Sequence, residues 1–102
     1  MSIGATQPFR AAGTATLAAG TASANVALAG AGEAVLVFNA STAIAFVRFG
    51  MDASITASGA DTPVPAGGRL LLHVGDYART AAAVLAAGGG SVFFTRGEGT
   101  IY

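Results

Sequence analysis

Residues 33–50, with the sequence EAVLVFNASTAIAFVRFG, constrain the fold of this chain more than any other stretch. Bulky Val, Leu, Ile and Phe side chains lie on both sides of a short polar segment at residues 39–42. Short runs of β-branched and aromatic residues bounded by Asn and Ser are typical of strands. The stretch therefore predicts two strands joined by a tight turn, with Phe38, Phe46 and Phe49 as the largest candidates for a core.

The second of these strands carries bulky apolar side chains on both faces. Ile44, Phe46 and Arg48 share one face. Val47 and Phe49 share the other. Only one face of a strand can point into the core of a two-layered domain, because side chains alternate between the faces. Monomers rarely expose large apolar patches, so we expect a loop or another subunit to cover the second face.

The rest of the chain consists of short apolar runs separated by Gly, Pro and Thr, without a sustained helical period. This pattern predicts an all-β fold, a jelly-roll-like antiparallel β-sandwich of about seven or eight strands. We expect an N-terminal arm at residues 1–10 and a single sandwich domain at residues 11–102. Further strands are predicted at residues 9–18, 23–29, 69–74, 77–87 and 91–96, with a short edge strand around Ile55.

The alanine-rich segment 77–87 is the one candidate for a helix, because alanine has the highest helix propensity. We favour a strand, since the triple glycine 88–90 separates this segment from the apolar run 91–96 and indicates a second hairpin. A helix is the alternative. Two prolines in residues 61–68 are expected to hold that segment as an extended connector.

Charged residues are sparse in this chain of 102 residues, which has five arginines, no lysine, five acidic residues and a formal net charge of zero. Nucleic-acid-binding domains usually carry a basic patch. Here Arg48, Arg69 and Arg96 are scattered, and we expect them to form surface or intersubunit ion pairs. Low charge density promotes association. Nucleic acid is therefore not an expected partner, whereas further copies of the chain are, as a dimer or a trimer.

Residues suited to catalysis or metal binding are few. The chain has no cysteine and one histidine, His73, which we expect to be a structural residue on a strand. The five acidic residues fall at expected turns or strand ends, where solvated side chains are usual. Residues 11–32 are uncharged, yet they are too rich in Ala, Gly, Thr and Ser for a membrane helix. We therefore expect no enzyme, no cofactor, no metal site and no membrane partner.

Three stretches carry a resemblance to a known group of proteins. They read NASTAIAFVRFG at 39–50, DTPVPAGGRLLLHVG at 61–75 and GGGSVFFTRGEG at 88–99. Their order and spacing resemble small β-sandwich structural proteins of the virions of tailed bacteriophages. A Pro-x-x-Gly turn before an apolar strand and a closing aromatic-x-x-Arg-Gly-Glu-Gly segment recur in such proteins.

The resemblance implies a structural role without catalysis. Such a protein would be a capsid decoration (cement) protein that lies on the capsid surface of the virion and stabilises the head by bridging subunits of the major capsid protein. The alternative is a module of a tail tip or fibre that binds a host-surface glycan. The candidate assembly contacts are Pro8, Phe9, Arg10, Phe46, Arg48, Phe49, Ile101 and Tyr102.

Overall fold

The chain forms a two-layered, all-β structure in a computed structural model that describes residues 8–52, 54–75 and 78–99. These residues contain eight strands and no helix, which confirms the predicted β-sandwich and the strand at the alanine-rich segment. The strands are β1 (Arg10–Ala19), β2 (Ala24–Ala27), β3 (Ala34–Asn39), β4 (Ala45–Gly50), β5 (Thr62–Val64), β6 (Arg69–His73), β7 (Thr80–Leu85) and β8 (Gly90–Glu98).

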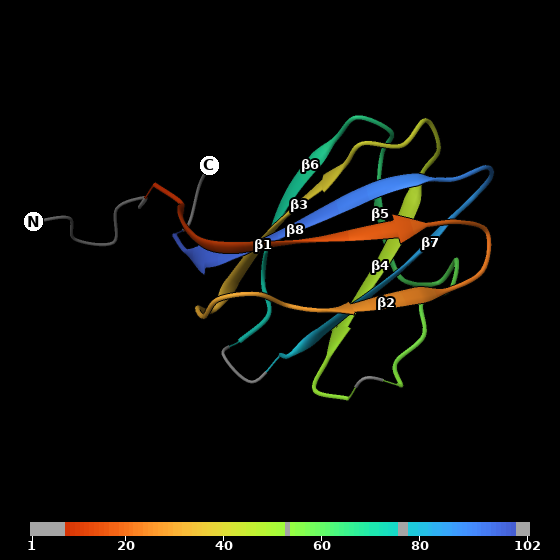
Figure 1. Ribbon diagram of the computed structural model, residues 1–102. Coiled ribbons are helices and arrows are strands. Elements are labelled where there is room, and N and C mark those ends of the chain that lie inside the picture. Colours follow the sequence, from red (N-terminus) through yellow and green to blue (C-terminus); the bar gives the residue numbers. More distant parts are fainter. Residues whose placement is uncertain (1–7, 53, 76–77, 100–102) are drawn as a thin grey trace, which may run out of the picture.

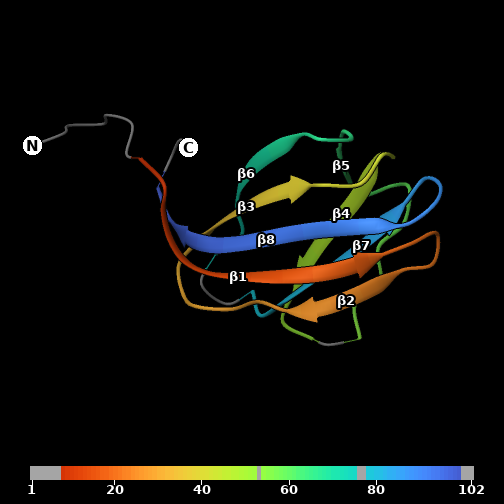
Figure 2. The ribbon, with the colours of Figure 1, turned by 45° about the horizontal axis from the view of Figure 1, so that its top comes forward.

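Two antiparallel sheets of four strands pack face to face (Figures 1 and 2). Sheet 1 has the strand order β1-β8-β3-β6, and sheet 2 has the order β2-β7-β4-β5. Consecutive strands lie in different sheets except at β4 and β5. Eight strands that pass repeatedly between two sheets in this way form a jelly roll. The predicted jelly-roll-like fold is therefore confirmed.

Both predicted hairpins are wrong in one respect, because each pair of strands is divided between the two sheets. β3 pairs with β6 and β8 in sheet 1, whereas β4 pairs with β5 and β7 in sheet 2. The triple glycine likewise joins β7 of sheet 2 to β8 of sheet 1. Strands that each bury one apolar face can lie side by side or opposite each other across a core, and the residue pattern does not distinguish these arrangements.

The corner between β3 and β4 is built on the side chain of Asn39, which has no exposed surface. Its Nδ2 atom donates to the carbonyl oxygens of Ala43 at 2.8 Å, Val64 at 3.0 Å and Pro65 at 3.3 Å. Its Oδ1 atom accepts from the Ser41 backbone nitrogen at 3.0 Å and from the Ser41 hydroxyl at 2.6 Å. The end of β3 in sheet 1 is thus tied to β5 in sheet 2.

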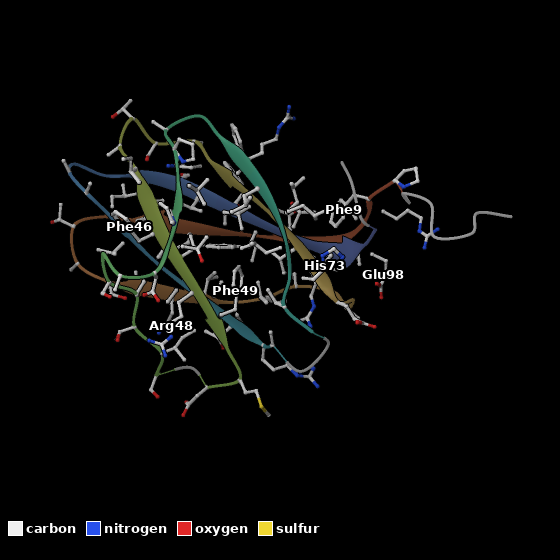
Figure 3. The ribbon with its side chains drawn as sticks, turned by 180° about the vertical axis from the view of Figure 1, so that it is seen from behind. Phe9, Phe46, Arg48, Phe49, His73 and Glu98 are labelled. Carbon is white, nitrogen blue, oxygen red and sulfur yellow. The ribbon has the colours of Figure 1, made fainter. Side chains whose placement is uncertain are left out.

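The core lies between the sheets and is formed mainly by Val, Leu and Ala side chains with one fully buried phenylalanine, Phe94. Phe49 packs edge-on against Phe94, with 5.8 Å between the ring centroids and 88° between the ring planes. Val47 is buried in the same cluster. Of the two faces of β4, the face with Val47 and Phe49 therefore points inward. Phe46 and Arg48 point away from the core (Figure 3).

The loop between β4 and β5, described at residues 51–52 and 54–61, packs against the outer face of sheet 2. The backbone nitrogen of Ala57 donates to the Ser23 hydroxyl at 2.8 Å, and Asn25 Nδ2 donates to the Ile55 carbonyl at 3.3 Å. Ala82 has no exposed surface although its neighbours on β7 face the core. The loop thus leaves β4, reaches the opposite edge of sheet 2 beside β2 and returns to β5. It provides part of the cover expected for this face.

The short strand predicted around Ile55 is wrong, and the edge strand β5 lies instead within the expected connector. In the loop, side chains bind the backbone locally: the backbone nitrogen of Ser58 donates to Asp61 Oδ2 at 2.8 Å. Such Asx-type contacts compete with strand pairing. β5 accommodates Pro63 because it is the outermost strand of its sheet, where a missing backbone donor is tolerated.

Replacing Asn39 with alanine tests the corner. We expect Asn39→Ala to lower the free energy of unfolding by about 3 kcal/mol, because buried carbonyl groups lose their donor. Urea denaturation at a fixed protein concentration measures this loss. Asn25→Ala removes an exposed amide from sheet 2 and should cost less than about 1 kcal/mol. Equal losses in the two variants would contradict the role of the corner.

Candidate assembly surfaces

The two ends of the described chain meet at one end of sheet 1. β1 and β8 run antiparallel, and Arg10 is the register partner of Glu98. Figure 3 shows Phe9, His73 and Glu98 together at this end. The Nε2 atom of His73 lies 2.9 Å from the carbonyl oxygen of Gly99, so the histidine holds the chain just after β8. This region is called the terminal end below.

Glycines allow the backbone to pack closely at the terminal end. A Cβ atom built on Gly97 would lie 2.0 Å from the carbonyl oxygen of Arg10. One built on Gly99, whose φ is +143°, would lie 2.5 Å from the Cα atom of Phe9. Any other residue at these positions would collide with backbone atoms. The two glycines of the Arg-Gly-Glu-Gly segment therefore allow the backbone at Phe9 and Arg10, where β1 begins, to pack directly against the end of β8.

Arg96 begins this segment and is 2% exposed. Its Nε atom donates to the carbonyl oxygen of Gly32 at 2.8 Å, Nη1 donates to that of Ala78, and Nη2 donates to that of Gly75 at 3.1 Å. One guanidinium group thus joins two loops to β8. The expected surface location of Arg96 is wrong. Val92 and Phe94 point inward, and the period of two along β8 places Arg96 on the same side.

The predicted assembly contacts fall on separate parts of the molecule. Pro8 and Arg10 are exposed and Phe9 is half-buried at the terminal end. Phe46 is half-buried and Arg48 exposed on the outer face of sheet 2, well away from Phe9 in Figure 3. Phe49 belongs to the core. Ile101 and Tyr102, together with residues 1–7 of the predicted arm, lie outside the described residues.

A further surface, which the residue pattern was not expected to form, lies on the outer face of sheet 1. Phe38 was expected in the core but points outward and is 37% exposed. Its ring stacks on that of Phe93, with 6.1 Å between centroids and 23° between planes. The outward direction of Phe38 can be inferred from the sequence of β3. Val35 and Val37 alternate with Leu36 and Phe38, and the two valines already fill the inner face of the strand.

Neighbouring residues extend this surface in two rows that run across sheet 1. The strand registers give the order of residues from β1 through β8 and β3 to β6. The Thr14 and Thr95 hydroxyls, which are 2.9 Å apart, hydrogen-bond to each other. The rows are Thr16, Phe93, Phe38 and Arg69, and Thr14, Thr95, Leu36 and Leu71.

No site for small-molecule chemistry emerges in the part of the chain that the structure describes. It encloses no pocket, and no group of three His, Cys, Asp or Glu side chains there could hold a metal ion. Among the same residues, no helix is long and apolar enough to cross a membrane. Asp52 and Asp61 accept hydrogen bonds from Ser54 and Ser58 within their own loop. These carboxylates serve the local turn structure.

Comparison with protein-family models, with curated proteins and with solved structures gives no match for this chain. Any functional conclusion therefore depends on its own residues and fold. Among the described residues there are three candidate contact surfaces: the terminal end, the outer face of sheet 2 and the outer face of sheet 1.

Replacing Gly97 with alanine tests the packing of the terminal end. The added methyl group would collide with the Arg10 carbonyl, so we expect Gly97→Ala to lower the free energy of unfolding by about 2 kcal/mol. Amide hydrogen exchange at the start of β1 should accelerate. Gly59→Ala is the matched control, because nothing lies within 4 Å of a Cβ atom at that position. Unchanged exchange in Gly97→Ala would contradict this account.

Proposed function

We propose that this protein is a structural component of a tailed-bacteriophage virion. In this role it decorates the capsid surface as a cement protein and bridges subunits of the major capsid protein. The jelly-roll topology is the observation that carries the proposal, because viral capsid domains are among the proteins built on this fold. A fold alone does not determine function. The resemblance of residues 39–50, 61–75 and 88–99 to small virion proteins adds support from the sequence.

The surface of the described residues suits a protein held by its neighbours. Phe38, Ile44 and Met51 are large, exposed hydrophobic residues. A chain with a formal net charge of zero and few charged groups is also prone to associate. Surface buried at the junction between capsid subunits would add to the free energy needed to separate them. This mechanism requires no catalytic group.

The terminal end is the proposed capsid contact. Its backbone is fixed by Gly97 and Gly99 against Phe9 and Arg10, and by His73. A contact surface that is ordered before binding loses less conformational entropy when it binds. We propose that Pro8, Phe9 and Arg10 contact the capsid together with residues 1–7.

A second candidate is a tail-tip or fibre module that binds a host-surface glycan. The jelly roll favours it too, because lectin domains share this fold. Aromatic side chains usually provide the flat surfaces that sugars contact. The two tyrosines, Tyr77 and Tyr102, lie outside the described residues. The exposed aromatic surface that the structure does describe is the stacked pair Phe38 and Phe93.

Removal of residues 1–8 tests the capsid contact. The sandwich should still fold, because β1 begins at Arg10. We expect the truncated protein to lose binding to capsids that lack the protein, as measured by co-sedimentation. Circular dichroism and the thermal midpoint check the fold. Gly59→Ala changes an exposed residue of the loop that no neighbouring atom contacts, and it should leave binding unchanged. Full occupancy by the truncated protein would contradict the proposed contact.

A further inference from the structure

The two sheets differ in what covers their outer faces. Residues 51–52 and 54–61 lie over part of sheet 2. They hydrogen-bond to Ser23, which directly precedes β2, and to Asn25 in β2. On sheet 1, β1 and β8 lie nearest the viewer in Figures 1 and 2, and no described segment passes in front of them. The stacked rings of Phe38 and Phe93 lie on this open face.

The open face is almost free of charge. The central part of the face carries threonine, leucine and phenylalanine side chains. Two of the threonine hydroxyls, those of Thr14 and Thr95, hydrogen-bond to each other. The ionisable groups, Arg69 and His73, lie on β6 at the edge of the sheet. Elsewhere in the described chain, charged side chains lie on loops, at strand ends or on sheet 2, and Arg96 is buried.

We propose that the outer face of sheet 1 binds the same face of a second copy of this protein, related by a two-fold axis. In such an interface each residue near the axis meets its own copy. A charge at the centre of the face would therefore meet a like charge, and this face has none there. Two sheets with the same twist stack well face to face, about 10 Å apart.

The size of the face indicates how strong this dimer is. The strands of sheet 1 are ten, nine, six and five residues long. With usual strand spacings, the face of each copy covers roughly 500 Å². Two copies would bury roughly 1,000 Å², near the lower limit for a specific interface. The dimer should therefore dissociate on dilution rather than be permanent.

The chemistry of the face argues against other partners. A nucleic acid would require a cluster of cations. An extended peptide would pair with a sheet edge rather than lie on a face. The proposal does not depend on the capsid function, because the terminal end, which is the proposed capsid contact, lies outside the two rows.

Sedimentation velocity of the full chain over a concentration series tests the dimer. We expect the wild-type protein to pass from monomer to dimer in the micromolar range. Thr16→Arg places a charge on the exposed β1 side of the face, beside Phe93. It should remain monomeric at every concentration. Phe38→Arg should behave in the same way, and circular dichroism and thermal midpoints verify that both variants are folded.

Ile44→Arg is the matched control, because it replaces an exposed hydrophobic residue that lies outside sheet 1. It should dimerise like the wild type. A wild-type protein that stays monomeric at hundreds of micromolar would overturn the proposal. So would a Thr16→Arg variant that dimerises normally. If the wild type is monomeric and Thr16→Arg instead lowers capsid occupancy, the face binds capsid protein and the proposal is wrong.

Discussion

The arrangement of the strands depends on the hydrogen bonds made by the buried side-chain amide of Asn39. Its nitrogen joins the end of β3 in sheet 1 to the chain around β5 in sheet 2, and its oxygen accepts a hydrogen bond from the Ser41 hydroxyl. A buried polar group is favourable only when its hydrogen bonds are formed. The corner therefore forms in one geometry, in which the chain crosses between the sheets after residue 39.

Crossing at this corner determines which surfaces the protein presents. With β3 and β4 on opposite sides of the core, Val37 and Val47 both point inward. Phe38 and Phe46 then point outward on different sheets. The loop between β4 and β5 covers part of sheet 2, whereas sheet 1 keeps an open face that is almost free of charge. The same corner thus separates one partly covered face from one that is available to a second copy.

The sequence allowed the strand content and the sandwich to be predicted, because runs of Val, Leu, Ile and Phe between glycines and prolines favour short strands. It did not determine which strands are neighbours. A turn such as residues 39–42 can close a hairpin or cross between sheets, and the difference depends on where the Asn39 amide finds acceptors. Those acceptors, near Val64, are distant in sequence.

The candidate surfaces were predictable only in part. Phe46 and Arg48 share an outward face, as alternation along β4 requires. Phe38 and Arg96 were assigned to the wrong side, although Val37 and Phe94 beside them indicate the correct face. The close backbone contacts at Gly97 could not be predicted, since a glycine has many possible roles until its neighbours are known.

Quantitative mass spectrometry of purified virions tests the central claim, that this protein is part of the capsid surface, most directly. Symmetric shells repeat each contact many times, so each particle should contain on the order of hundreds of copies of a decoration protein. A tail module would be present at about a dozen copies or fewer, since a tail has low symmetry. Absence of the protein from purified particles would contradict both structural roles.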